Sequence, residues 1–314
     1  MRNLRRALIY SSVAAGAWLV ICISCGVFAV EAALHPGRNV EGAHSEELAA
    51  AIAASHQATL IDASVTAGDG VLLRGWSIRQ VHGNGDVVIL LHGQSDNRAG
   101  MLGYADLMLR HGYSVLLPDA RAHGLSGGDL ATYGVNEADD VRRWYYWISK
   151  TESPRCIYGL GESMGAAQLL NSLGSERGFC AVVAESSFAS FREASYDRLG
   201  EKLNAGAWAG KTILRPAVEA GLLYAMWKYG VNLEQASPEN AVATSRVPVL
   251  LIHGLKDTNL PPCNSEMILA RSRARGLAAV LWEPAGAGHT GAASAEPEEF
   301  ERRVIGWFES HDRP

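Results

Sequence analysis

Apolar and polar positions divide the chain into short apolar runs and amphipathic segments. The runs have the length and β-branched content of buried strands, and lie near residues 87–91, 114–118, 155–160, 180–184, 247–252 and 279–282. Apolar residues also recur at helical spacing, in the sets Met101, Ala105, Met108, Leu109; Val141, Trp144, Tyr145, Ile148; and Phe300, Val304, Trp307, Phe308. This alternation predicts an α/β fold, with a mainly parallel twisted sheet covered by helices on both faces.

Two segments depart from this alternation. Residues 59–65 and 71–78 flank a Gly-Asp-Gly turn and predict a leading antiparallel hairpin. The stretch from about 190 to 243 is too long for a single crossover and is rich in large apolar side chains. We expect it to be a helical insertion; the alternative is two ordinary helices packed on the sheet.

The N-terminus has a different character. Residues 7–30 carry no charge over 24 positions, which as a helix would be about 36 Å long and enough to cross a bilayer with tilt. Three arginines precede the run and hold the N-terminus in the cytoplasm by the positive-inside rule: Arg2, Arg5 and Arg6. Residues 1–31 are thus predicted as a membrane anchor, 32–57 as a stalk and 58–314 as an outward-facing domain. A cleaved signal peptide is the alternative, although the run exceeds the usual core of about 7–15 residues.

Composition narrows the function. The hydrophobic content of 48% and charged content of 19% are ordinary for a globular enzyme. The net charge of −5 and the lack of a basic stripe exclude a nucleic-acid partner. The sequence has no GxGxxG, no phosphate-binding loop and no His/Cys ligand cluster, so we expect neither cofactor nor metal. Cys156 and Cys180 open consecutive predicted strands, where they either form a disulfide or remain small buried residues.

The pentapeptide at 161–165, Gly-Glu-Ser-Met-Gly, is the strongest chemical signal. It reads G-x-S-x-G and lies between a predicted strand and a helical run. A serine on such a sharp turn has its hydroxyl exposed at a helix N-terminus, and the glycines let the backbone turn. Ser163 is therefore the predicted nucleophile.

Partners for this serine follow in the required order. Asp257 lies in the loop after the run at 247–252, and His289 lies on a Gly-rich loop after the run at 279–282. A serine hydroxyl needs an imidazole to remove its proton, and the imidazole needs a carboxylate to fix its tautomer. Glu185, just after the preceding strand, is the competing acid. His311 is a poor competing base because it lies in the polar C-terminal tail.

An oxyanion hole is also expected. The run at 87–91 ends in His-Gly, and the following Gln94 is placed to supply one backbone N–H donor. Met164, the residue after the nucleophile, supplies the other. His92 precedes the acid and lies under this loop, so we assign it a structural role.

Together these segments resemble the α/β-hydrolase superfamily, in particular the bacterial serine aminopeptidase-like and prolyl-oligopeptidase-like esterase group. The resemblance runs from about residue 58 to 310 and rests on five segments: His92-Gly93, Pro118–Gly128, the 161–165 turn, His253–Asp257 and Gly288-His289. The second resembles the D-x-R-G-H-G-x-S-x-G loop of the family, with Ala122 where glycine is usual. The resemblance implies a structural role for this loop, and a cap over Ser163 at about 190–243.

The chain is therefore expected to be a membrane-anchored serine hydrolase that cleaves ester or amide bonds of small substrates through an acyl-enzyme. A serine peptidase or aminopeptidase on the same triad is the alternative, disfavoured because no propeller or other large specificity domain is present. A dehalogenase would need a carboxylate at position 163. A non-catalytic binding module is disfavoured because all three triad residues are retained.

Overall fold

A computed structural model describes residues 2–40 and 42–312 of the chain. The outermost positions of the predicted anchor and domain (1, 313 and 314) and position 41 of the predicted stalk lie outside the described residues. The described chain forms two compact units. One consists of the residues up to Leu34 together with Arg192–Glu234, and the other of His35–Phe191 together with the residues from Gln235 onward.

Within the described residues, the larger unit contains one sheet of eight strands in the order β1-β2-β4-β3-β5-β6-β7-β8. The strands are β1 (Ala58–Thr66), β2 (Leu72–Gln80), β3 (Val87–Leu91), β4 (Ser114–Pro118), β5 (Ile157–Glu162), β6 (Val182–Glu185), β7 (Val249–Ile252) and β8 (Ala279–Trp282). β2 pairs antiparallel with β1 and β4, and the remaining pairs are parallel. The predicted hairpin and mainly parallel sheet are thus confirmed.

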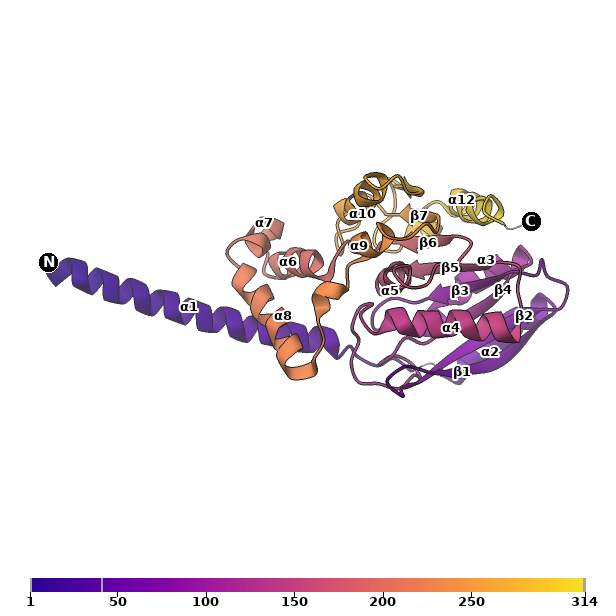
Figure 1. The fold of residues 1–314 in the computed structure, drawn as a ribbon, viewed down its shortest axis with the longest axis horizontal. Coiled ribbons are helices and arrows are strands. Elements are labelled where there is room, and N and C mark those ends of the chain that lie inside the picture. The colour runs from indigo at the N-terminus through magenta and orange to yellow at the C-terminus, as the bar shows by residue number, and fades with distance from the viewer. Residues whose placement is uncertain (1, 41, 313–314) are drawn as a thin grey trace. The chain divides into compact units, whose positions relative to one another are not determined.

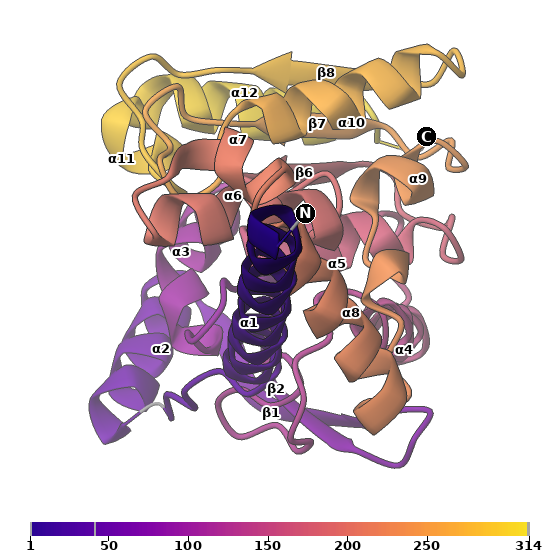
Figure 2. The same cartoon turned by 90° about the vertical axis from the view of Figure 1, so that its left-hand side faces the viewer.

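Helices cover both faces of this sheet, as predicted (Figure 2). One core layer includes Tyr158 and Phe300, and the other includes Trp144 and Leu169. The first layer is covered by α2 (Ala43–Ser55), α3 (Leu102–Arg110), α11 (Ala292–Ala295) and α12 (Pro297–Glu309). The second is covered by α4 (Glu137–Thr151), α5 (Met164–Ser172), α9 (Pro238–Val242) and α10 (Cys263–Arg273). Short 3₁₀ helices occur at η1 (Arg98–Met101) and η2 (Leu233–Gln235).

Part of the predicted stalk folds with the larger unit. Ala49 and Ala53, on α2, are buried in the first core layer. The guanidinium of Arg38 donates hydrogen bonds to the carbonyls of Gly124 (3.2 Å) and Gly128 (2.8 Å). These contacts tie residues on both sides of position 41 to the sheet unit.

The smaller unit is helical. It comprises α1 (Arg2–Leu34), α6 (Phe191–Lys202), α7 (Gly206–Lys211) and α8 (Arg215–Tyr229), apart from Phe191. Figures 1 and 2 show α8 beside the C-terminal part of α1. By length and composition α1 is able to cross a membrane. The predicted insertion is therefore helical, and its role as a cap over Ser163 stays a prediction.

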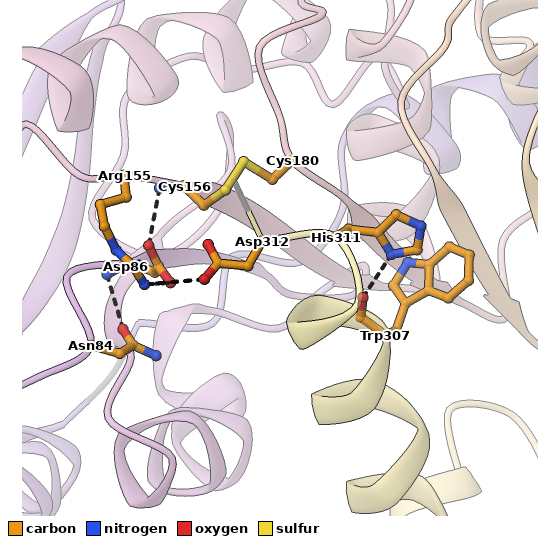
Figure 3. The surroundings of a disulfide bond; sticks show 8 residues. All are labelled: Asn84, Asp86, Arg155, Cys156, Cys180, Trp307, His311 and Asp312. Carbon is orange, nitrogen blue, oxygen red and sulfur yellow. Dashed lines mark hydrogen bonds and ion pairs between the residues drawn. A yellow bond between two sulfur atoms is a disulfide. The ribbon is translucent and has the colours of Figure 1, made fainter. Parts of the chain in front are cut away.

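A disulfide joins Cys156 and Cys180 just before the starts of β5 and β6 (Figure 3). The sequence left open whether these cysteines form a disulfide or remain free and buried, and in the structure they form the disulfide. Beside it, the carboxylate of Asp86 accepts hydrogen bonds from the backbone N–H of Cys156 (3.0 Å) and the guanidinium of Arg155 (3.1 Å). Arg155 also lies 3.3 Å from the carboxylate of Asp312. The crosslink thus lies at the amino ends of the parallel strands.

Candidate active site

Ser163 occupies the turn between β5 and α5, at the carboxyl end of the sheet. Its φ and ψ are 50° and −114°, a left-handed region that costs a non-glycine residue energy and is often found at functional sites. The flanking glycines are required by close backbone contacts. A Cβ on Gly161 would lie 2.6 Å from the carbonyl oxygen of Gly165, and a Cβ on Gly165 would lie 2.6 Å from that of His92.

Ser163, His289 and Asp257 form a continuous hydrogen-bonded chain. Nδ1 of His289 lies 2.7 Å from Oδ2 of Asp257, and its Nε2 lies 2.9 Å from Oγ of Ser163. Because a carboxylate can only accept, Nδ1 carries the proton and Nε2 accepts from the serine hydroxyl. This is the tautomer that a general base for Ser163 requires.

Asp257 is buried, and its carboxylate accepts several hydrogen bonds from neighbouring groups. Its Oδ1 accepts the backbone N–H groups of Asn259 and Leu260, each at 2.9 Å. Burial alone would raise its pKa, but hydrogen bonds from His253, His289 and the Leu260 N–H hold the pKa of Asp257 well below its ordinary value. The carboxyl group is therefore ionised at every pH at which the protein would work.

Glu185, the competing acid, is also buried but has other partners. Its Oε1 accepts the N–H of Ala292 (2.9 Å), and its Oε2 accepts the hydroxyl of Tyr104 (3.2 Å). Burial raises the pKa of Glu185. The carboxylate that accepts the hydrogen bond from His289 is that of Asp257.

Glu162 directly precedes the nucleophile and was not singled out by the sequence. Burial, together with the carboxyl groups of Glu185 and Asp96, raises the pKa of Glu162 to about 7. Position 162 is one of the two variable positions of G-x-S-x-G, so the motif gives no information about it. Only the fold brings the Glu185 carboxyl close, through the pairing of β5 with β6.

The loop after β3 passes beside the nucleophile, as an oxyanion loop must. A Cβ built on Gly93 would lie 3.7 Å from the Cβ of Ser163. Gln94 follows Gly93 and is partly exposed, whereas Met164 begins α5 and is buried. His92 is buried, with Nδ1 2.7 Å from the carbonyl of Gly93 and Nε2 accepting the N–H of Ala120. These backbone contacts fit the structural role predicted for His92.

The loop at 118–128 is held by buried hydrogen bonds. The Asp119 carboxylate accepts the N–H groups of Arg98 (2.8 Å) and Leu125 (2.9 Å), and Arg121 binds Asp140 through two contacts of 2.7 Å. Ala122 has a φ of 60°, the left-handed region that glycine adopts most easily. That conformation explains why the family that this loop resembles usually has glycine at the position of Ala122.

Neither the competing base nor the surface hollow of the sheet unit belongs to the hydrogen-bonded set of Ser163, His289 and Asp257. His311 caps α12, where its Nδ1 lies 2.8 Å from the carbonyl of Trp307. A shallow hollow lined by Val65, Tyr146 and Trp147 contains none of the predicted catalytic residues. Among the described residues, no group of three or more His, Cys, Asp or Glu side chains is arranged to hold a metal ion.

Comparisons with known proteins identify the family to which the chain belongs. Residues 88–303 match the profile described as the alpha/beta hydrolase family. YqkD of Bacillus subtilis (strain 168) is 28% identical over 207 residues, which is 65% of this chain and 65% of that protein. YfhR of Escherichia coli (strain K12) is 26% identical over 218 residues, 66% of each. The chain thus matches slightly under two thirds of the length of these relatives.

Solved structures show the same fold. The Pyrococcus furiosus esterase Pf2001 superposes with a TM-score of 0.69 at 24% identity, covering 89% of this chain and 100% of that one. An acylaminoacyl peptidase from Pyrococcus horikoshii gives a TM-score of 0.62 at 17% identity, covering 81% of this chain and 42% of that one. Because the family profile matches residues 88–303, the superfamily that the sequence motifs resemble is confirmed.

Proposed function

Because the chain belongs to the alpha/beta hydrolase family, we propose that it is a serine hydrolase that cleaves esters of small acyl groups through an acyl-enzyme. The observation that carries the proposal is the hydrogen-bonded chain from Ser163 through His289 to Asp257. Its tautomer, its buried acid and its strained nucleophile all suit acyl transfer.

Acylation begins with the hydroxyl of Ser163. Nε2 of His289 removes the proton as Oγ attacks the substrate carbonyl, and Asp257 stabilises the imidazolium that forms. The N–H groups of Met164 and Gln94 stabilise the negative charge on the carbonyl oxygen. His289 then gives its proton to the departing alkoxide, and the acyl group stays on Ser163.

Deacylation repeats the same steps with water. His289 removes a proton from a water molecule, which attacks the acyl carbonyl, and the proton returns to Oγ of Ser163 as the acid leaves. The depressed pKa of Asp257 supports this role, because an ionised carboxylate is present throughout the cycle.

A peptidase using the same triad is the second candidate. The likeness to an acylaminoacyl peptidase favours it, but that likeness covers 42% of the peptidase, whereas the likeness to the esterase Pf2001 covers all of that chain. We therefore place ester cleavage first. A panel of p-nitrophenyl esters and peptide p-nitroanilides of the same acyl groups separates the two.

The chain is further proposed to be anchored by α1, with its hydrolase unit outside the cytoplasm. The cluster of arginines before the apolar run supports this orientation, as does the Cys156–Cys180 disulfide, since such crosslinks persist in oxidising compartments. A retained anchor, rather than a cleaved signal peptide, is favoured because the apolar run exceeds the usual signal-peptide core of about 7–15 residues, and because Gly26 of α1 lies against Gly221 of α8.

Active-site labelling tests the proposal. A fluorophosphonate probe should label the wild-type chain and Ser149→Ala, whose hydroxyl bonds only within α4 in the described structure. Ser163→Ala should remain unlabelled and lose several orders of magnitude in kcat, because only the oxyanion hole and binding would remain. Labelling of Ser163→Ala equal to that of wild type would show that another residue is the nucleophile.

A further inference from the structure

Helix α8 is apolar on two opposite faces. One face carries small residues at a spacing of four, all buried: Ala217, Gly221 and Ala225. At about 100° per residue, Leu223 and Trp227 fall on the other side. Their side chains are exposed to 71% and 81%, and the neighbouring Met226 is exposed to 46%. From Ala220 to Trp227 the helix carries no charged residue, and a helical segment that is apolar on both faces belongs in a protein core or in a membrane.

The small-residue face of α8 packs on α1. A Cβ built on Gly221 would lie 2.7 Å from the carbonyl oxygen of Gly26, so the two backbones meet with no side chain between them. Val30, one turn further along α1, is also buried and lies against Gly221. Close backbone contact through small residues is the usual packing of transmembrane helices.

This contact fixes the depth of α8 along α1. A hydrocarbon core of about 30 Å takes about 20 helical residues, so a span that begins at Ala7 reaches the far boundary near Gly26. Beyond that point, the Glu31 carboxylate accepts hydrogen bonds from the ammonium of Lys228 and the hydroxyl of Tyr229, each at 2.8 Å. Tyrosine, tryptophan and lysine are the residues expected at this boundary, where lipid headgroups lie.

We infer that the outer face of α8, formed by Leu223, Met226 and Trp227, is a second membrane contact that inserts into the lipid leaflet around the end of α1. The occupant is the bilayer because this face continues from the membrane-spanning helix at the level of the headgroups. Two further large apolar side chains in the same helical unit are also exposed: Trp208 and Ile213. The inference rests on the anchoring of α1 and is independent of the chemistry at Ser163.

Quenching of tryptophan emission by lipid tests this contact. The full chain is placed in phosphatidylcholine vesicles, with and without bromine atoms on the acyl chains near the headgroup. The emission difference between wild type and Trp227→Phe reports Trp227 alone, and the difference for Trp147→Phe, on α4 of the sheet unit, is the matched control. Trp227 should lose most of its emission to the brominated lipid, and Trp147 should lose none.

A charged substitution on the same face gives an independent readout. Leu223→Glu changes an exposed side chain, so folding in detergent should be unaffected, yet it should weaken the quenching of Trp227. Trp227 emission that brominated lipid leaves unchanged would overturn the inference, whether water or a second copy of the chain surrounds the indole. Equal quenching of Trp147 would overturn it as well, because the contact would then not be specific to α8.

Discussion

Nε2 of His253 lies 3.3 Å from Oδ2 of Asp257, the same oxygen that accepts the hydrogen bond from His289. His253 is fully buried, and its Nε2 also lies 2.8 Å from the carbonyl of Leu260. Its Nδ1 lies 2.7 Å from the hydroxyl of Ser265 on α10. The carboxylate of Asp257 thus contacts two imidazoles, and the hydrogen bond from His253 helps to keep it ionised and in place.

The first prediction concerns the acid. Asp257→Asn should lower kcat by about 10⁴-fold, because an amide in place of the carboxylate favours the wrong tautomer of His289. Glu185→Gln should cost far less, since Glu185 bonds to Tyr104 and the N–H of Ala292. Steady-state hydrolysis of a p-nitrophenyl ester measures both variants. If Glu185→Gln lost most of its activity while Asp257→Asn kept it, Glu185 and not Asp257 would be the acid of the triad.

The sequence predicts the candidate nucleophile and base, but it does not decide between Asp257 and Glu185 as the acid. Asp257 and Glu185 both follow strands, and those strands, β7 and β6, are neighbours with their carboxyl ends at the same edge. A sequence pattern places both carboxyl groups near His289 and gives no information on which way each side chain turns. The hydrogen bond from the Ala292 N–H, which comes from a distant segment, decides the orientation of Glu185.

Local features were predicted better than long-range ones. Gly161 is required by a backbone contact inside the turn, and Gly165 by the close approach of the His92 carbonyl, so the geometry of the elbow is marked by a pattern of five residues. β5 extends two residues beyond the predicted run, to Glu162, because backbone pairing with β6 continues after the apolar residues end. The packing of α8 on α1 joins residues about two hundred positions apart. Because the central residues of α8 are apolar on both faces, the sequence has no periodic signal that shows which face packs on α1.

The second prediction concerns pH. Burial raises the pKa of Glu162 from 4.5 to about 7, so between these values the unfolded chain releases a proton that the folded chain retains. Stability should therefore fall as the pH rises through this window and stay lower above it. Glu162→Gln removes this effect, and should be more stable than wild type at pH 8 by up to about 3 kcal/mol, with no gain at pH 4.

Urea denaturation of both proteins at pH 4 and pH 8 measures this difference. Glu47→Gln, at an exposed position on α2, is the matched control and should change stability equally little at both values. A gain for Glu162→Gln that is the same at pH 4 and pH 8 would show that its cause is packing and not ionisation.

The third prediction concerns the loop at 118–128. The guanidinium of Arg121 and the carboxylate of Asp140 are 95% and 93% buried, and form two hydrogen bonds of 2.7 Å. Arg121→Met leaves the carboxylate without this partner, which should cost about 3–5 kcal/mol at neutral pH. The pKa of Asp140, already raised to about 6 by burial, should rise further in the variant, so the cost should shrink as the pH falls from above that higher value to about 6.

Arg142→Met is the control for this change. Arg142 binds Asp139 on the same helix, where both side chains are more than 30% exposed, and the pair should contribute less than about 1 kcal/mol. Denaturation midpoints at pH 5 and pH 8 compare the two variants. Equal destabilisation by both, or a cost for Arg121→Met that does not change with pH, would contradict the role given to the buried pair.

The last prediction concerns the disulfide, and it tests fold and location together. Cys156 and Cys180 are 24 positions apart, and closing a loop of that length stabilises a protein by about 3.5 kcal/mol in the chain-entropy description. Reduction of the wild type, or the double change Cys156→Ala and Cys180→Ala, should therefore lower the free energy of unfolding by about that amount. Reductant should have no further effect on the double variant.

Thiol counting on chain taken directly from membranes gives the location. If the sheet unit lies outside the cytoplasm, the denatured but unreduced chain should react with maleimide at three of its five cysteines, Cys22, Cys25 and Cys263. Reduction should then expose the other two. Five reactive thiols before reduction would place the unit in a reducing compartment, because a crosslink at the starts of two neighbouring strands would otherwise have formed and persisted.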